Sequence, residues 1–395
     1  MHLSYKILIG LVLGVIAGLV AGPASAPLLK VWVAPVGTFF INLIKMIIVP
    51  VVLASLICGA AALGDVKKLG RIGAKVMTFY LLTTAFAVSL GLFLGHIMQP
   101  GKGLVLPAGA KVAAKEAPPI SQVLVNLVPA NPFQAMVSAD MLQVIVFAIF
   151  IGVGVTMVGE RAKPVEAFFD GLAEVTYKII DVIMNFAPIG VFALIMPVVA
   201  VNGPKVLLPL ASVIAAVYIG CLLHMAVVYS GSVSILGGMS PVRFFKGIFP
   251  AMLVAFSTCS SSATLPVNMK CTQENLGVNK DISSFCLPLG ATVNMDGTAL
   301  YQGVCALFVA QVYGIDLSMG QYITIILTGT LASIGTAGVP GAGLIMLTMV
   351  LQSVGLPLEG IALVAGIDRV LDMIRTTVNI TGDAAACVVI QKSET

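Results

Sequence analysis

The sequence predicts an all-α polytopic membrane protein, and both composition and hydropathy pattern support this fold class. Of its 395 residues, 59% are hydrophobic and only 10% are charged, whereas a soluble domain carries about 25% charged residues. Apolar runs of about 20 residues, long enough to cross the hydrocarbon core of a bilayer, recur from Ile7 to the C-terminus. We therefore expect the whole chain to be a membrane domain.

The apolar runs are separated by glycine, proline and charged residues, which mark the ends of the expected spans. The first run also fits a signal peptide, because Lys6 and an apolar segment precede Ala24-Ser25-Ala26. A stretch rich in Pro, Gly and Lys at 99–119 is expected to lie outside the membrane. The expected spans lie near 7–29, 36–63, 72–98, 168–200 and 206–236, with a long, uneven apolar region at 120–159.

Basic residues indicate the orientation of the chain, because short cytoplasmic loops of membrane proteins are enriched in Lys and Arg. If Lys6 is cytoplasmic, most basic residues return to its side. We therefore expect a multi-pass protein of the cell (inner) membrane with both termini in the cytoplasm and no nucleic-acid partner. The residues expected on that side are Lys67, Lys68, Arg71, Lys75, Arg161, Lys163, Arg243, Lys246, Lys270, Lys280 and Lys392.

The last third of the chain contains two apolar segments that polar residues interrupt. From 243 to 273, the run Ser257–Ser262 and then Pro266 break an apolar stretch whose two flanks are basic. From 317 to 355, the break lies at 333–343 and is rich in glycine. A segment that enters and leaves the membrane on one face is a re-entrant hairpin. We expect two such hairpins, entered from opposite sides.

A polar helix follows each expected hairpin. The first, 282–312, is interrupted at 294–298, and the second, 356–391, holds Asn379 to Asp383. Hairpin, helix, hairpin and helix together form an inverted repeat. Interrupted segments in corresponding positions of two halves indicate the binding site of a transporter, because irregular backbone at membrane depth must line protein or a water-filled cavity.

The final helix carries a stripe of polar residues. Asp368, Asp372, Arg375, Asn379 and Asp383 are spaced by 4, 3, 4 and 4 residues, so at about 100° per residue they fall within roughly 60° of one another. A charge at the centre of a membrane helix costs about 2.5–3.5 kcal/mol. The stripe is therefore expected to face the protein interior as a functional site. The alternative is a set of salt bridges that only holds helices together.

These side chains suggest sites for cations and for an anion. Asp296 and Asp383 are expected cation ligands, because each lies near an Asn, a Gly and carbonyls freed by a helix break, and hard cations prefer oxygen. Arg375 matches a carboxylate with two hydrogen bonds. Asp372 either neutralises that arginine or holds a substrate ammonium. The run Ser260–Ser262 suits a second carboxylate, although such a run is also typical of a simple turn.

An enzyme is not expected. His2, His96 and His224 lie far in sequence from these motifs, and neither G-x-S-x-G nor H-E-x-x-H occurs. The seven cysteines are odd in number and show no C-x-x-C spacing, so neither disulfides nor a zinc site is expected.

Five motifs carry a resemblance to a known family. They are Y-L-L-T-T (80–84), S-S-S-A-T-L-P (260–266), N-M-D-G-T (294–298), S-I-G-T-A-G-V-P-G-A-G (333–343) and D-M-I-R-T-T-V-N-I-T-G-D (372–383). With them the chain resembles, from end to end, the glutamate transporter family of dicarboxylate/amino-acid:cation symporters. The resemblance implies a homotrimer of subunits with eight transmembrane helices and two re-entrant hairpins, working by an elevator mechanism.

The resemblance also implies two domains in each subunit. A static scaffold comprises 1–71 (helices 1 and 2) and 120–200 (helices 4 and 5). A moving transport domain comprises 72–98 (helix 3) and 206–395, and hairpin two is expected to be the extracellular gate. Within 206–395 the expected parts are helix 6, hairpin one at 243–273, helix 7 at 282–312, hairpin two at 317–355 and helix 8 at 356–391.

The resemblance further implies the ligands of the site. Arg375 would bind the side-chain carboxylate of an acidic substrate and Asp372 its ammonium group. The site would be completed by Asn379, Thr298, Ser260, Ser261, Ser262 and Val339. Up to three sodium ions are implied, the first at the Gly290 carbonyl, Asn294, Asn379 and Asp383. The second would be held by carbonyls of Thr292, Ser333, Ile334 and Thr336, near Met295. The third would be held by Tyr80, Thr83, Thr84, Asn294 and Asp296.

One departure from the family pattern concerns an additional arginine near the site. The family often has it at the positions that are Cys259 and Met373 here. We expect Arg369, with Asp368 as its partner, to stand in for it.

From these patterns and the resemblance, we expect a Na⁺-coupled symporter of L-aspartate or L-glutamate. The nearest alternative is a symporter of C4-dicarboxylates coupled to H⁺ or Na⁺, but a substrate without an ammonium group has no use for Asp372. The alternative of another class is an anion channel in which the broken hairpins line a pore.

Overall fold

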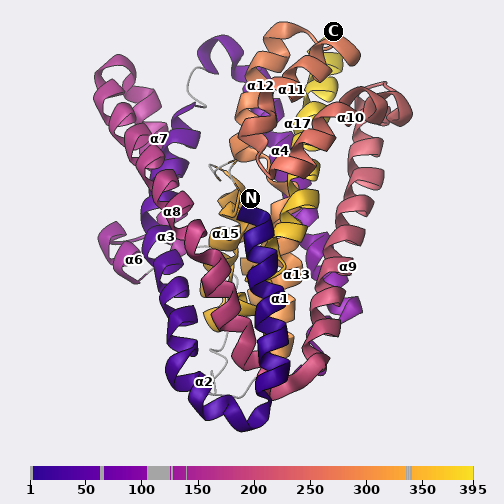
Figure 1. Cartoon of the computed structure of the whole chain (residues 1–395). Helices are drawn as coiled ribbons and strands as arrows, with labels where there is room; N and C mark the ends of the chain where they lie inside the picture. Colours follow the sequence, from indigo (N-terminus) through magenta and orange to yellow (C-terminus); the bar gives the residue numbers. More distant parts are fainter. Residues whose placement is uncertain are drawn as a thin grey trace.

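The computed structural model describes residues 3–62, 66–104, 125, 128–138, 140–334, 336, 338 and 340–394, and every regular element within these ranges is a helix. Figure 1 shows long helices packed side by side, with the C-terminus at one end of the molecule and α2 at the other. The external stretch expected at 99–119 is described only as far as residue 104. Its remainder lies outside the described residues.

The first expected span, 7–29, is not one straight helix. Helix α1 ends at Ala21, and the chain then bends by 95°. Gly22 has a φ of 62°, in the left-handed region that glycine adopts without strain, and Pro23 cannot donate a hydrogen bond to the preceding turn. The predicted span is therefore bent, although the bent pair together is long and apolar enough to count as one crossing. The elements on either side of this bend are α1 (Leu3–Ala21), α2 (Ala26–Trp32) and α3 (Ala34–Ala62).

The N-terminal half forms one group of helices. Helices α1 and α3 both pack on α8, and α7 packs on α3. The expected spans 36–63 and 168–200 correspond to α3 and α8, and the described part of 120–159 holds α6 and α7. The bounds of these later helices are α6 (Pro132–Ser138), α7 (Met141–Val158) and α8 (Lys163–Asn202).

Helix α1 approaches α8 closely through a line of glycines. Gly10, Gly14 and Gly18 recur every fourth residue and therefore lie on one side of the helix. A Cβ atom added at Gly18 would lie 2.6 Å from the carbonyl oxygen of Met196 and 2.8 Å from Cβ of Val199. Small residues allow membrane helices to pack backbone against backbone, so this line fixes how α1 meets α8.

A second group forms around α4 (Val66–Met98), which packs on α9, α13 and α14 although these follow it by more than 100 residues. Helix α9 (Leu207–His224) continues into two π-helical turns, Met225–Tyr229 and Ser232–Leu236. The expected helices at 72–98 and 206–236 are therefore present, and the second changes from α-helix to π-helix in its last part.

The first expected hairpin is present, but its break is narrower than predicted. Only Cys259 and Ser260 separate its two helices, and Cys259 has a φ of 54°. The Ser260 hydroxyl caps the second helix by accepting from the Ala263 N–H at 3.1 Å. Pro266 lies inside that helix, so the prediction that it extends the break is wrong. The two arms are α10 (Pro241–Thr258) and α11 (Ser261–Lys270).

The second hairpin and the interrupted helix between the two hairpins are also present. The break in the interrupted helix is Asn294-Met295, and the break in hairpin two spans residues 334–341. Both breaks lie where the sequence predicts them, but they are narrower than the predicted 294–298 and 333–343, because the flanking helices extend into both motifs. The four helices are α12 (Lys280–Val293), α13 (Asp296–Val312), α14 (Met319–Ser333) and α15 (Ala342–Ser353).

Helix α17 (Asp368–Glu394) is continuous, almost wholly buried, and packs on α10, α11, α12 and α13 (Figure 1). It begins later than the predicted start at 356, because the short helix α16 (Ile361–Ala365) and a turn precede it. In the described part of the chain, five helices are long and apolar enough to cross a membrane, or six if the bent pair at the N-terminus is counted. The expected eight crossings stay a prediction.

We predict that Gly18→Val lowers the stability of the protein by about 1–3 kcal/mol, because the added side chain has no space against Met196 and Val199. Gly154→Val in α7 is the matched control, since a Cβ atom there meets nothing within 4 Å. The unfolding temperature of both variants is measured in detergent, with size-exclusion chromatography as the readout of the folded fraction. Equal unfolding temperatures would contradict the described packing of α1 on α8.

Candidate functional site

Helix α17 directs its polar stripe into the protein interior. Asp368, Asp372, Arg375, Asn379 and Asp383 are each at most 6% exposed, and Arg375 is fully buried. The prediction that the stripe faces protein is confirmed. Along α17 the stripe divides into an arginine end and an end formed by Asn379 and Asp383.

The arginine end is built around the guanidinium of Arg375. Its Nη2 donates to Asp368 Oδ1 at 2.8 Å and lies 3.0 Å from Asp372 Oδ1. Its Cζ lies 4.0 Å from the centre of the Tyr301 ring, which is cation–π geometry. Gly343 lets α15 approach, since a Cβ there would lie 2.6 Å from Nη1. Within the described residues, Nε and Nη1 have no hydrogen-bond partner, so the guanidinium retains donors for a ligand.

A second arginine, Arg369, faces Asp372 with its Nη1 3.5 Å from Asp372 Oδ2. The prediction that Asp368 is the partner of Arg369 is therefore wrong. Consecutive residues of a helix point about 100° apart, whereas residues seven apart, such as Asp368 and Arg375, share one face after two turns. Two arginines and two aspartates balance each other at this end of the stripe.

The tips of the two hairpins meet beside the stripe. The Ser260 hydroxyl donates to the Gly338 carbonyl at 2.6 Å, and the Ser262 N–H donates to the same oxygen at 3.2 Å. Ser261 is buried and Ser262 is exposed. The Ser260 hydroxyl and the Ser262 N–H, which were expected to bind a carboxylate, are thus hydrogen-bonded to hairpin two. Val339, the other expected tip residue, lies outside the described residues.

A small cavity lies between the tips, α13 and α17. Its volume is about 10 Å³, which is room for about one water molecule. Six of the predicted ligands line it: Ser261, Met295, Thr298, Thr336, Asp372 and Asn379. A molecule the size of an amino acid therefore fits only after the tips separate.

The break between α12 and α13 crosses α17 at Asn379 and Asp383. The Asn294 side-chain amide donates to the Asn379 carbonyl at 3.1 Å and to Asp383 Oδ1 at 3.0 Å, and Asn379 Oδ1 accepts from the Gly297 N–H at 2.8 Å. A Cβ added at Gly290 would lie 2.6 Å from Asp383 Cγ. The unwound backbone near Asp383 thus comes from α12 and α13, because α17 itself is unbroken.

The residues implied for a second sodium ion lie around the end of α14. The Thr336 N–H donates to the Ser333 carbonyl at 3.2 Å, and Ile334 caps the helix. Met295 and Thr336 line the same cavity, and Met295 Sδ accepts from the side-chain amide of Asn379 at 3.1 Å. Thr292 is half-buried in the last turn of α12, which meets the tip of hairpin two. The structure therefore brings this set to one region.

Asp296 begins α13 and is held by three side chains. Its Oδ1 accepts from the Thr84 hydroxyl at 2.6 Å, and its Oδ2 accepts from the Tyr229 hydroxyl at 2.8 Å and lies 3.1 Å from His224 Nε2. All four residues are fully buried. The start of a helix also favours a negative charge. The carboxylate is therefore fixed between α4 and α9.

The other residues implied for the third sodium ion lie nearby without bonding Asp296. The Tyr80 hydroxyl donates to the Cys286 carbonyl at 3.0 Å, and the Thr83 hydroxyl donates to the Tyr80 carbonyl at 3.2 Å. Both precede Thr84 on α4 and are buried. Asn294 turns toward Asp383 instead.

His224 and Tyr229 were missed by the sequence analysis. The histidine lies far from the motifs along the chain, 72 residues before Asp296. A signal was nevertheless available, because an ionisable group inside an apolar membrane helix is by default functional. Its partner was hidden, because only the tertiary packing of α9 on α13 brings the two together.

Asp296 and Asp383 differ in one respect from the aspartates at the arginine end. They are 0% and 1% exposed, and in the described part of the chain neither forms a salt bridge with an arginine or lysine. A buried carboxylate without a counter-charge costs several kcal/mol, so each requires a cation or a proton. The oxygen atoms present fit a hard cation, since Asn294, whose amide N–H bonds Asp383, has a buried Oδ1 with no hydrogen-bond partner among the described residues.

Comparisons with known proteins agree with this chemistry. The sequence model of the sodium:dicarboxylate symporter family matches residues 3–393. The chain is 40% identical to the proton/sodium-glutamate symport protein of Geobacillus stearothermophilus, over 99% of its own length and 94% of the relative. It is 39% identical to the proton/glutamate-aspartate symporter of Escherichia coli, over 91% and 85% of the two chains. It is 37% identical to the C4-dicarboxylate transport protein of Bacillus subtilis, over 91% and 87%.

We predict that Asp383→Asn raises the unfolding temperature in a choline chloride buffer without sodium or potassium. The substitution removes a buried charge that has no counter-charge, and each kcal/mol gained is worth roughly 2–4 °C. Asp281→Asn, at an exposed position of α12, is the control. Thermal unfolding in detergent measures both. A lower unfolding temperature for Asp383→Asn would show that the carboxylate is not left unbalanced in that buffer.

Proposed function

The chain belongs to the sodium:dicarboxylate symporter family, and we propose that it imports an acidic amino acid, L-aspartate or L-glutamate, by secondary active symport with sodium ions. One observation carries this proposal: a single buried cluster joins a charge-balanced arginine end to two carboxylates that, in the described part of the chain, have no arginine or lysine partner. The arginine end, which carries both positive and negative side chains, suits a substrate with a carboxylate and an ammonium group. The two carboxylates require cations. The family is one of symporters, and no enzymatic activity is proposed.

Arg375 and Asp372 form the two poles of the proposed substrate site. The side-chain carboxylate of the substrate would accept from the N–H groups of Arg375 that lack a partner. Its ammonium group would pair with Asp372 and displace Arg369, which now lies 3.5 Å away. Thr298 and Asn379 line the small cavity together with Asp372, and they complete the proposed site.

The α-carboxylate of the substrate would lie at the hairpin tips. There it would replace the Gly338 carbonyl as the acceptor for the Ser260 hydroxyl and the Ser262 N–H. Opening of hairpin two would break these two hydrogen bonds and admit the substrate. We therefore propose that hairpin two is the gate on the extracellular side, with Ser261 and Val339 as further tip residues of the site.

The cations would be held at the three sites implied by the family motifs. Bound sodium supplies positive charge that offsets Asp383 and Asp296. Asn294 bonds Asn379 and Asp383, and Asn379 also lines the substrate cavity. One chain of hydrogen bonds thus joins a proposed cation site to the proposed substrate site. This chain is the proposed physical basis of coupling, because a cation at Asp383 would fix Asn294, which bonds the backbone of the residue whose side chain lines the substrate cavity.

The packing of the helices supports an elevator mechanism. Helices α1, α3, α7 and α8 pack on one another and correspond to the proposed scaffold, 1–71 and 120–200. Helices α4, α9 and α10 to α17 surround the site and correspond to the proposed transport domain, 72–98 and 206–395. We propose that the second group moves against the first and carries the site across the membrane, with both termini in the cytoplasm.

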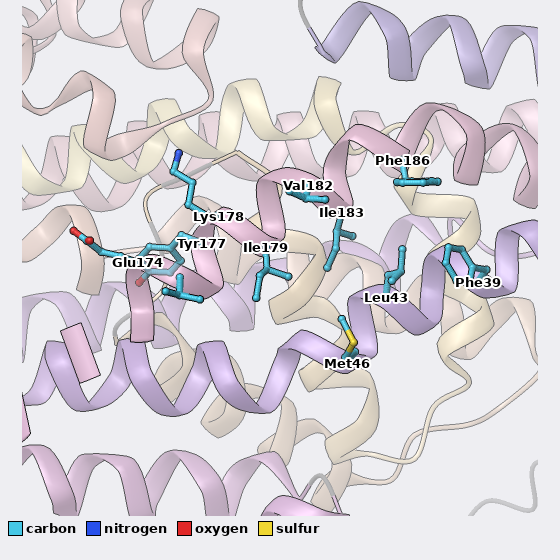
Figure 2. A pocket seen from close by; sticks show the side chains of 11 residues that line it. Phe39, Leu43, Met46, Glu174, Tyr177, Lys178, Ile179, Val182, Ile183 and Phe186 are labelled. Atoms are coloured by element: carbon cyan, nitrogen blue, oxygen red, sulfur yellow. The ribbon is translucent and has the colours of Figure 1, made fainter. Parts of the chain in front are cut away.

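An apolar groove on the scaffold supports the proposed homotrimer. It lies between α3 and α8, where the exposed rings of Phe39 and Phe186 mark one end, and Glu174 and Lys178 mark the other (Figure 2). The proposed occupant is a different face of a second copy of this chain, because a ring of three subunits is built from heterologous, head-to-tail contacts.

Two other readings remain as alternatives. A proton can neutralise a buried carboxylate as sodium does, and the relatives from Geobacillus and Escherichia carry the word proton in their names. A C4-dicarboxylate is carried by the relative from Bacillus, as its name states, but such a substrate leaves Asp372 without an ammonium partner. An anion channel is the alternative of another class.

Uptake into proteoliposomes tests the proposal. We expect an inward sodium gradient to drive accumulation of radiolabelled aspartate above equilibrium, with unlabelled glutamate competing more strongly than succinate. A pH gradient in sodium-free buffer should not drive aspartate accumulation. Stronger competition by succinate would favour the dicarboxylate reading, uptake driven by the pH gradient alone would favour protons, and equilibration without accumulation would favour a channel.

We predict that Arg375→Ala abolishes aspartate uptake and weakens aspartate binding about 100-fold or more, because a buried charged partner of the substrate is removed. Sodium should still raise the unfolding temperature, because Asp383 and Asp296 are unchanged. Arg375→Lys keeps the charge without the two-pronged geometry and tests the same point if the alanine variant is unstable. Arg161→Ala, at an exposed position, is the control. Unchanged aspartate affinity would exclude the assignment.

A further inference from the structure

His224 and Tyr229 form contacts that the proposed sodium sites do not include. Both side chains are fully buried, and both contact the same oxygen of Asp296, at 3.1 Å and 2.8 Å. Thr84 donates to the other oxygen from α4. Asp296 therefore has one oxygen held by two groups from a single segment, the end of α9 and its π-helical turn.

The π-helical turn explains how both side chains reach one carboxylate. His224 is the last residue of α9, and Tyr229 is the last residue of the turn Met225–Tyr229. In an α-helix, residues five apart point about 140° away from each other. In a π-helical turn the hydrogen bonds join residues five apart, so these residues lie almost above one another. The local change in helix type thus places two donors on the side that faces α13.

The surroundings of the imidazole leave Asp296 as its hydrogen-bond partner. Its ring stands edge-on to the Tyr229 ring, with centroids 4.8 Å apart, and the Phe86 ring lies 6.0 Å away. Nδ1 has no hydrogen-bond partner among the described residues, so Asp296 is the polar group that this ring contacts. Leaving one ring nitrogen unpaired costs about 1–3 kcal/mol. An apolar side chain would fill the space without this cost, so packing alone does not account for a histidine.

We propose that His224 and Tyr229 are positioning residues that set the affinity of the Asp296 site for its coupling cation. They occupy Oδ2, so that a cation can approach the carboxylate only from the side of Oδ1 and Thr84. Without them, the carboxylate would be free to rotate away from α4. Groups that orient a ligand of a metal ion typically change affinity by about 10–100-fold when removed. This inference rests on the proposed sodium coupling.

The test is a sodium titration of protein stability, without substrate and without transport. The unfolding temperature is measured while sodium replaces choline at constant ionic strength. We expect His224→Leu to raise the sodium concentration for half-maximal stabilisation by about 10-fold or more. His224→Gln, which keeps an N–H donor, should stay within about 3-fold of the unchanged protein. Tyr229→Phe should shift the midpoint in the same direction as His224→Leu, and it carries the test if that variant does not fold.

The control is His96→Gln, the same type of change at an exposed position of α4. A purely structural role would lower the unfolding temperature of His224→Leu and Tyr229→Phe equally at every sodium concentration. An unchanged midpoint in both variants would overturn the inference, while sodium coupling itself would stand. If sodium does not stabilise even the unchanged protein, the proposed sodium coupling fails and this inference fails with it.

Discussion

Burial of negative charge is the constraint on which the rest of this structure depends. Four aspartates of α13 and α17 lie at or below 6% exposure inside a chain with few charged residues. Two of them, Asp368 and Asp372, are neutralised by arginines of their own helix. The other two, Asp296 and Asp383, are not. In a medium of low polarity such carboxylates are tolerated only with an added positive charge, so a requirement of folding becomes a requirement for a ligand.

The backbone at the helix breaks and the buried polar side chains of α17 form hydrogen bonds with each other. Irregular backbone at membrane depth needs hydrogen-bond partners, and polar side chains at the same depth need them as well. The Gly341 N–H donates to Asp372 Oδ2 at 3.2 Å, and the Gly297 N–H donates to Asn379 Oδ1 at 2.8 Å. Each break therefore supplies donors to the stripe of α17. This exchange explains why the interrupted segments of both halves gather around one buried helix.

Features with a local or periodic cause could be predicted from the sequence. The stripe of α17 follows from helical spacing, and the glycine-rich break of hairpin two follows from its composition. Features that depend on packing could not be predicted. The bend at Gly22 lies within an apolar run, and the partner of Arg369 depends on which side chains α17 turns toward its neighbours. His224 meets Asp296 through the packing of α9 on α13, and Tyr229 joins it through the π-helical turn that follows. No residue pattern in that segment predicts such a turn.

The contact between the hairpin tips has a consequence for selectivity. Hairpin one contributes two donors and hairpin two contributes one carbonyl, and all three are satisfied only when the tips touch. A guest molecule that wedges between them must offer an acceptor to the first tip. If it lacks one, closure leaves donors bare in an apolar environment, at about 1–3 kcal/mol each. Closure of the tips is thus favourable when no molecule is bound, or when the bound molecule supplies the acceptor. A molecule without that acceptor disfavours closure.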